Sequence, residues 1–147
     1  MNAIHRLTLE DRSSPDDITT LHRGLETFNR RVAGDVNYRP LNVFVRDDTG
    51  AVSGGLLGAT YWSWFAIEIL WLHDNLRGRR IGTRLVTMAE EEATRRGARH
   101  AQVDTVDFQA LGFYQKLGYA VFGQLENCPE GHTRYYLAKD LPTNNKG

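Results

Sequence analysis

A basic loop that carries two glycines is the part of this sequence best suited to binding an anion. Residues 77–82 read Arg-Gly-Arg-Arg-Ile-Gly and lie between an apolar run, 67–72, and a segment with helical periodicity. The glycines remove side chains where the loop enters the helix, so backbone N–H groups can approach a ligand closely. The positive end of a helix dipole also favours an anion there. The alternative is an ordinary connection with a solvated arginine run, because short glycine motifs often match by chance.

Glu68 is the residue whose position suggests acid–base chemistry. It is an ionisable group inside an apolar strand, and strict alternation places it on the same face as Leu70 and Leu72. A half-buried carboxylate there can have a raised pKa and act as a general base. The alternative is a carboxylate that points at solvent or pairs with an arginine, and the residues leave both readings open. The weaker candidates for a base are His73, Asp104 and His132.

A strand, a loop and a helix in succession must position these groups. The apolar run 67–72 predicts a strand that breaks at the turn-prone residues 73–75. From residue 81 to residue 96 the pattern becomes helical, and all but one of the residues on its predicted buried face are apolar. That face consists of Ile81, Leu85, Met88, Ala89, Glu92 and Ala93.

The segments before this unit predict one helix and several strands. Residues 4–9 alternate weakly and favour a first strand. Ser14 and Pro15 then begin an amphipathic helix that ends at Gly34. Residues 41–46 and 51–60 predict an antiparallel hairpin. The aromatic run 61–65, Tyr-Trp-Ser-Trp-Phe, indicates either core packing or the wall of a small pocket.

The segments after this unit complete a sheet that mixes parallel and antiparallel strands. Residues 99–106 predict a strand parallel to 67–72, because a helical crossover separates the two. A short helix is expected at 108–117, and residues 119–125 and 133–137 predict a final hairpin. The element order is β α β β β α β α β β, which is typical of an α/β fold.

The composition indicates one globular domain without a global charge. The 147 residues are 41% hydrophobic and 24% charged, which suffices for a single sizeable core. Basic and acidic residues balance at 18 each, so no overall field recruits nucleic acid or an anionic membrane. Cys128 is the single cysteine, which excludes an intramolecular disulfide and offers no metal-ligand spacing. No apolar leader or long apolar run occurs, and we therefore expect a protein of the reducing cytoplasm.

Two blocks of this sequence, in this element order, resemble the GNAT superfamily of acetyl-CoA-dependent N-acetyltransferases. Residues 76–85 read Leu-Arg-Gly-Arg-Arg-Ile-Gly-Thr-Arg-Leu, and residues 110–119 read Ala-Leu-Gly-Phe-Tyr-Gln-Lys-Leu-Gly-Tyr. The chain departs from the family pattern where Arg80 replaces the first patterned glycine and where Asp107 stands in place of an asparagine.

The resemblance implies a single-domain, GNAT-like α/β (α+β) fold over residues 1–141, followed by a flexible tail, 142–147. It further implies a mixed central sheet of six or seven strands, with a parallel pair at the cofactor cleft and helices on both faces.

The same resemblance implies roles for particular residues. Tyr114 aligns with the family's general acid, whereas the alternative is one more core aromatic on its helix. Some relatives use a glutamate on the central strand as the base, which corresponds to Glu68. Acetyl-CoA is expected to bind through its pyrophosphate at the loop, through its pantetheine arm at the central strand, and near the second block. The implied cofactor-binding residues are Leu70, Trp71, Leu72, Arg77, Gly78, Arg79, Arg80, Ile81, Gly82, Thr83, Asp107 and Gln109.

The expected activity is transfer of acetyl from acetyl-CoA to a primary amine of a small molecule, by direct attack. No activated serine or cysteine motif indicates a covalent enzyme intermediate. The alternatives are an acyl-CoA-binding regulatory module without turnover and an acetyltransferase for peptide or protein amines. A dinucleotide-binding oxidoreductase is disfavoured by the glycine spacing. Exposed edge strands and aromatic residues are compatible with a homodimer.

Overall fold

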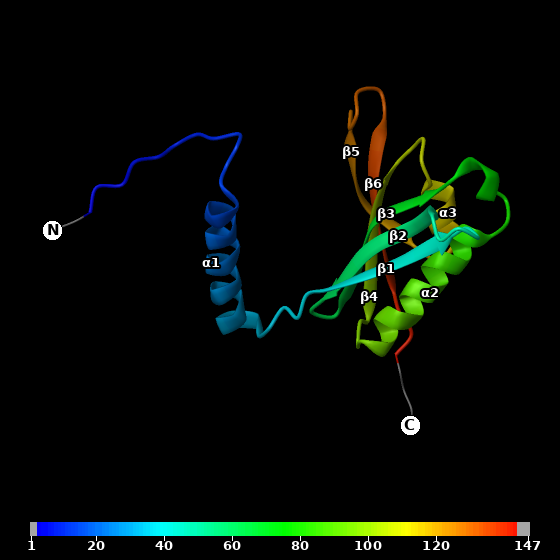
Figure 1. Ribbon diagram of the computed structural model, residues 1–147, viewed down its shortest axis with the longest axis horizontal. Helices are drawn as coiled ribbons and strands as arrows, with labels where there is room; N and C mark the ends of the chain where they lie inside the picture. The colour runs from blue at the N-terminus through cyan, green and yellow to red at the C-terminus, as the bar shows by residue number, and fades with distance from the viewer. Residues whose placement is uncertain (1–2, 144–147) are drawn as a thin grey trace. The chain divides into compact units, whose positions relative to one another are not determined.

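The computed structural model describes residues 3–143, and residue contacts divide the chain into two compact units. The unit Met1–Val36 contains the helix α1, and the unit Asn37–Gly147 contains a six-stranded sheet. The strand order is β1-β2-β3-β4-β6-β5, in which β3 and β4 are the parallel pair (Figure 1). The elements are α1 (Pro15–Ala33), β1 (Arg39–Arg46), β2 (Val52–Tyr61), β3 (Trp64–Leu72), a 3₁₀ turn η1 (Asp74–Leu76), α2 (Ile81–Arg95), β4 (His100–Val106), α3 (Leu111–Lys116), β5 (Ala120–Glu126) and β6 (Thr133–Asp140).

The N-terminal unit forms the predicted helix but not the predicted strand. Ser14 caps α1 by accepting a hydrogen bond from the Asp17 N–H at 3.1 Å, and Pro15 opens the first turn. Gly34 ends the helix at a φ of 78°, which favours glycine. The strand expected at residues 4–9 was wrong: these residues form no strand, and their apolar side chains are exposed. The alternation of apolar and polar residues at 4–9 was weak. The described residues of this unit contain no other strand with which such a segment could pair.

The predicted strand pairings of the sheet are confirmed. β1 and β2 form an antiparallel hairpin whose turn is closed by hydrogen bonds between Asp47 and Ala51. β4 runs parallel to β3, as the helical crossover requires. β5 and β6 form the final antiparallel hairpin, and β6 also pairs with β4.

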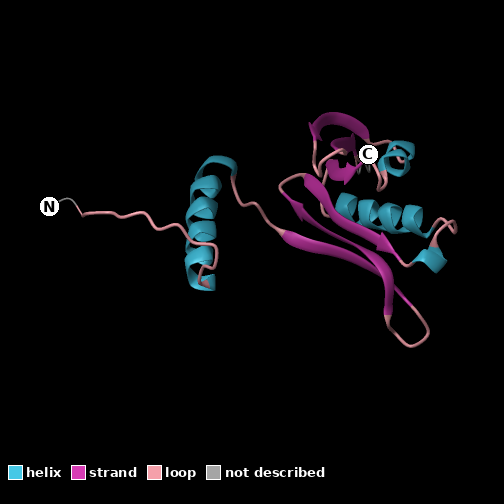
Figure 2. Ribbon diagram, turned by 90° about the horizontal axis from the view of Figure 1, so that it is seen from above, coloured by secondary structure: helices cyan, strands magenta, loops and turns pink. Residues whose placement is uncertain are grey.

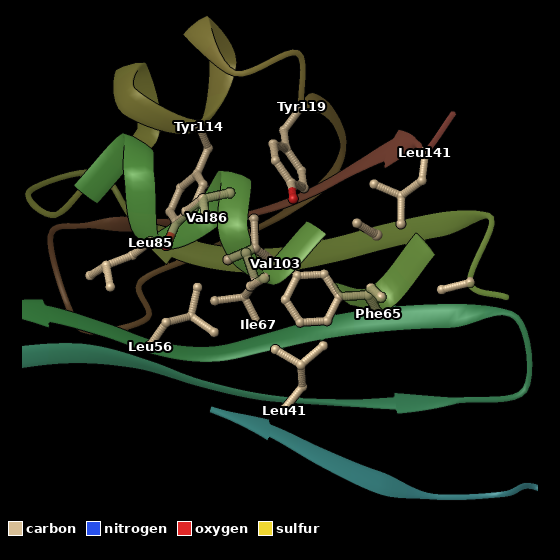
Figure 3. Close-up of a cluster of buried hydrophobic side chains, with 14 of the residues drawn as sticks. Leu41, Leu56, Phe65, Ile67, Leu85, Val86, Val103, Tyr114, Tyr119 and Leu141 are labelled. Carbon is tan, nitrogen blue, oxygen red and sulfur yellow. The ribbon is translucent and has the colours of Figure 1, made fainter. Parts of the chain in front are cut away.

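The helix α2 packs against the face of β1, β2 and β3, where the core lies (Figure 2). Strand side chains such as Leu56 and Phe65 point toward Val86 of α2 and Tyr114 of α3 (Figure 3). The expected buried face of α2 was partly wrong, because Met88 is 51% exposed whereas Val86 is fully buried. Apolar periodicity alone does not fix the rotation of a helix when alanines and glycines allow close packing.

Two predictions about the whole chain stay predictions. Both α2 and α3 contribute to one core, and α1 belongs to a separate unit, so helices on both faces of the sheet stay an expectation. The same holds for a single domain over residues 1–141. Of the tail predicted at 142–147, residues 144–147 lie outside the described residues. Among the residues described, no helix combines the length and apolar character that a membrane crossing requires.

Arg96 joins the end of α2 to the first hairpin and offers a test of how the core is held. Its Nη1 donates to the carbonyls of Arg39 (3.3 Å) and Pro40 (3.0 Å) and to Thr60 Oγ1 (3.1 Å), while its Nε donates to Glu92. We expect Arg96→Met to lower the free energy of unfolding in urea by about 1–3 kcal/mol, since the buried Thr60 hydroxyl and two backbone carbonyls lose their donor.

The matched control is Arg95→Met. Arg95 contacts the same Glu92, but its side chain is 62% exposed, and we expect a change below about 1 kcal/mol. An equal decrease in the free energy of unfolding for the two variants would contradict a stabilising role for the hydrogen bonds of Arg96.

Candidate active site

The parallel strands β3 and β4 separate halfway along their length, and this separation forms the site. Their pairing ends at Ile67 and Val103. Immediately after this point β3 carries a bulge, because the β2 partner of Ile67 is Gly58 and the next β2 residue, Leu57, already pairs with Ile69. A bulge bends its strand and increases the local twist. The backbone of β3 beyond Ile67 therefore presents hydrogen-bonding groups that have no β4 partner.

Glu68 is the extra residue of this bulge, which corrects its predicted orientation. Glu68 and Ile69 are adjacent and both exposed, whereas Leu70 and Leu72 pack against the core. The bulge shifts the alternation by one residue, so Glu68 does not share the face of Leu70 and Leu72, and the half-burial expected for it is not observed. Within residues 3–143 its carboxylate takes part in no hydrogen bond or ion pair.

A cavity of about 670 Å³ occupies the space between the separated strands. This volume lies in the range of small-molecule and cofactor sites. Eight of the predicted site residues line it: Glu68, Leu70, Trp71, Leu72, Arg77, Gly82, Gln109 and Tyr114. The cavity thus brings residues of β3, the loop before α2, the loop after β4, and α3 to one place.

The start of α2 forms one edge of the cavity and has the features of an anion site. The first hydrogen bond of the helix runs from Arg84 N–H to Arg80 O at 3.1 Å, so the N–H groups of residues 81–83 lack helical acceptors. Gly78 and Arg80 both have positive φ, and an added Cβ at Gly78 would meet no atom within 4 Å. The free donors of residues 81–83, the open space at Gly78 and the four exposed arginines nearby fit a diphosphate.

Gly78, Arg79, Arg80, Ile81 and Thr83 belong to this edge without lining the cavity itself. Arg77 reaches the cavity and also forms an exposed ion pair with Asp74 at 3.5 Å. Their predicted contact with a cofactor stays a prediction.

Tyr114 combines a buried ring with a hydroxyl that opens onto the cavity. Its ring packs edge-on against Phe113 and Tyr119, and the residue is 4% exposed. Among residues 3–143, every side-chain polar atom that is fully buried has a hydrogen-bond partner, whereas the Tyr114 hydroxyl has none. The hydroxyl oxygen is therefore not fully buried. The oxygen is therefore accessible from the cavity that the residue lines. Burial, together with the nearby charge of Asp104, raises the pKa of Tyr114 to about 12.

Asp107 is turned away from the cavity and toward the loop between β5 and β6. Its Oδ1 lies 2.8 Å from His132 Nδ1, and its Oδ2 accepts the Thr133 N–H at 3.0 Å. The Thr133 N–H, followed by His132, lowers the pKa of Asp107. With both oxygens engaged, the geometry gives no support to the cofactor contact expected for Asp107.

Gln109 does line the cavity, and its orientation is set by the backbone. Its Oε1 accepts the Val106 N–H at 2.8 Å, which leaves the side-chain NH₂ as a donor. Of the two alternatives for the aromatic run 61–65, the structure favours core packing, since none of its residues lines the cavity. Phe65 is instead fully buried in the core.

Several cavity residues were missed or underrated by sequence reasoning. Asp104, first considered only as a weak base, lines the cavity from the end of β4. Its position could have been found, because ligand sites form at the carboxyl ends of parallel strands. Sequence reasoning also assigned no site role to Thr105, Phe108 and Phe113, which line the cavity.

Comparisons with known proteins agree with this geometry. A model of the acetyltransferase (GNAT) family matches residues 1–119. The chain is 38% identical over 107 residues to a blasticidin-S acetyltransferase of Streptomyces morookaense, covering 70% of this chain and 79% of that protein. It is 32% identical over 131 residues to an acetyltransferase of Agrobacterium fabrum, covering 89% and 96%.

A solved structure of similar sequence has the same fold. The crystal structure of an acetyltransferase from Agrobacterium tumefaciens matches with a TM-score of 0.87 and 31% identity, over 92% of this chain and 99% of that one. The chain described here therefore belongs to the acetyltransferase (GNAT) family.

Proposed function

We propose that this acetyl-CoA-dependent N-acetyltransferase acts on a primary amine of a small molecule, by direct attack with both substrates bound. The observation that carries the proposal is the shared cavity of Tyr114 and Glu68. An accessible phenol and an exposed carboxylate supply the acid and the base that amide formation from an ammonium ion requires.

The residues around the cavity fit acetyl-CoA. The N–H groups of residues 81–83 and the arginines before them would hold its pyrophosphate. The unpaired edge of β3 from Glu68 to Leu72 and the Gln109 amide would hydrogen-bond its pantetheine arm. When bound, acetyl-CoA supplies the acetyl group as a thioester, whose C–S bond breaks as the new N–C bond forms.

Two residues would move the protons. The Glu68 carboxylate takes one proton from the acceptor ammonium, which leaves a neutral nitrogen able to attack. The Tyr114 Oη gives its proton to the departing sulfur and regains one from the nitrogen that becomes an amide. Glu68 then releases its proton to solvent, so the balance is one amide, one thiol and one proton.

Cys128 gives no support to a covalent acetyl-enzyme route. It lies in the loop between β5 and β6, where the Arg134 Nε donates to its sulfur at 3.3 Å, and it does not line the cavity. Direct transfer of the acetyl group needs only residues that line the cavity, whereas a covalent route would need a thiol that lies outside it.

A small-molecule acceptor is supported by one relative. The similar protein of Streptomyces morookaense is named for blasticidin S, which makes a small amine-bearing acceptor the first class to test here. An acyl-CoA-binding module without turnover and an acetyltransferase for protein amines are the alternatives that the test separates.

The deciding experiment measures thiol release from acetyl-CoA with a panel of small amines and peptides. We expect release with small amines, and a decrease of about 10²–10⁴-fold in kcat for Tyr114→Phe with little change in the KM for acetyl-CoA. Tyr135→Phe is the matched control, because Tyr135 packs against the same core without lining the cavity.

Coenzyme A binding without thiol release for any amine would favour the regulatory module. Release only with peptides would favour a protein acetyltransferase. A burst of thiol before amine addition would contradict direct attack.

The raised pKa of Tyr114 sets a pH dependence for the same reaction. The phenol donates only while it holds its proton, and with a pKa of about 12 it loses that proton only as the pH rises through that value. We expect the ratio of wild-type to Tyr114→Phe rates to stay constant from about pH 6 to about pH 10. A ratio that already falls between about pH 8 and pH 10 would mean that Tyr114 ionises near the ordinary value of tyrosine.

A further inference from the structure

Tyr114 lies on α3, a helix that is too short to fix its own orientation. The helix spans six residues, and no side chain of the described residues caps its first turn. A helix of this length is marginal by itself, so its position is set by contacts with other elements. The place of the Tyr114 hydroxyl in the cavity therefore depends on what holds α3 and the turn that follows it.

One of these contacts lies at the start of α2. An added Cβ at Gly82 would lie 3.3 Å from Phe113 Cζ, so the first turn of α2 packs directly against α3. The same turn carries the free N–H groups of residues 81–83. A displacement of α3 along α2 would therefore change the distance between Tyr114 and the candidate diphosphate site.

A second attachment is formed by a largely buried carboxylate in the middle of α2. Glu90 Oε2 accepts the Tyr119 hydroxyl at 2.7 Å, and Glu90 Oε1 accepts Lys139 Nζ at 3.1 Å. The side chains of Glu90 and Lys139 are only 15% and 19% exposed. Lys139 Nζ also donates to the Leu117 carbonyl at 2.8 Å, which holds the end of α3. The carboxylate thus ties α2 to β6 and to the turn after α3.

Tyr119 connects this attachment to Tyr114 in two ways. Its ring packs edge-on against the Tyr114 ring at 5.7 Å between centroids, and both rings extend toward the sheet (Figure 3). Its backbone N–H donates to the Tyr114 carbonyl at 3.1 Å. Burial, followed by the charge of Glu90, raises the pKa of Tyr119, so its hydroxyl keeps the proton that it donates.

Stability alone does not account for a charged pair at this place. Removing a carboxylate and an ammonium group from water costs about as much free energy as their attraction returns. Hydrogen bonds to charged groups do supply direction, because each one fixes the geometry of the two elements that it joins. The Glu90 pair therefore sets where α3 lies against α2 more than it adds to the free energy of unfolding.

We propose that Glu90 is a positioning residue, which acts through Tyr119 to hold the Tyr114 hydroxyl at its place in the cavity. Lys139 completes the arrangement, because it fixes the carboxylate and the end of α3. Glu90 itself does not line the cavity. The inference rests on the proposed function, since the positioned hydroxyl is the one that gives its proton to the departing sulfur.

The kinetic test breaks the same link from its two ends. Glu90→Ala removes the acceptor, whereas Tyr119→Phe removes only the hydroxyl and keeps the packed ring. We expect Glu90→Ala to lower kcat about 10- to 100-fold, because a displacement of about 1 Å has effects of this size. Tyr119→Phe should act in the same direction. The KM for acetyl-CoA should change little, because neither residue lines the cavity.

The Tyr114→Phe background separates positioning from a general loss of structure. Once the Tyr114 hydroxyl is absent, Glu90→Ala should not lower kcat further, whereas a general loss of structure would lower it in both backgrounds. Tyr119→Phe gives the same comparison if Glu90→Ala does not fold. Glu91→Ala is the matched control, because Glu91 is the next residue of α2 and is exposed. It should keep the wild-type kcat.

NMR of the full chain with isotope-labelled tyrosine rings provides a measurement that does not depend on turnover. The Tyr114 signal is identified by its loss in Tyr114→Phe. We expect this signal to shift or broaden in Glu90→Ala and to stay unchanged in Glu91→Ala. An unchanged signal in Glu90→Ala, or additive effects of Glu90→Ala and Tyr114→Phe on kcat, would overturn the inference and leave the proposed function standing.

The opposite result distinguishes a failure of the proposed function. If the Tyr114 signal depends on Glu90 but Tyr114→Phe keeps the wild-type kcat, the acid role of Tyr114 is contradicted. The positioning of its ring by Glu90 would then still stand.

Discussion

The separation of β3 from β4 is the constraint on which the rest of the structure depends. Two adjacent parallel strands would normally continue their hydrogen bonds to the end of the sheet. Here the bulge at Glu68 bends β3, and Gly58 opposite makes the bend possible, because a Cβ at Gly58 would lie 2.5 Å from the Ala66 carbonyl oxygen. The open strand edge and the cavity both follow from this local irregularity.

The electrostatic layout of the site follows from the ends of secondary structure elements. The helix α2 begins beside the end of β3, so its unsatisfied N–H groups and the preceding arginines lie at one edge of the cavity. The carboxylates of Glu68 and Asp104 lie at the point where the strands separate. The start of α2 therefore favours a polyanionic donor, whereas the charge of Asp104 is already paired with Arg134.

Tyr114 serves both the core and the site. Its ring contacts Phe113 and Tyr119, and the Tyr119 hydroxyl donates to Glu90 of α2 at 2.7 Å. Lys139 of β6 forms an ion pair with the same Glu90 at 3.0 Å, which joins α2, α3 and β6 around the phenol. Burial that holds the ring in place also disfavours its ionisation, so rigidity and a raised pKa have the same physical cause.

The sequence by itself determined the elements and their order from Ser14 to Asp140, because capping residues, glycines and apolar periodicity act locally. The family was also predictable, and the residues of the candidate anion site could be named in advance, since the loop and the start of α2 are contiguous. The exception at residues 4–9 shows the limit, because a weak alternation forms a strand only beside a partner.

Only the tertiary structure decided which side chains meet in the cavity. The bulge placed Glu68 on the face opposite to the one predicted. The bulge depends on the pairing of β3 with β2, so the sequence pattern of β3 alone does not predict it. Asp107 was drawn to His132 and Thr133, which are distant in sequence, while Asp104 gained a fixed orientation from Arg134. These outcomes depend on contacts between segments that fold together only through the sheet, which residue spacing along one segment does not encode.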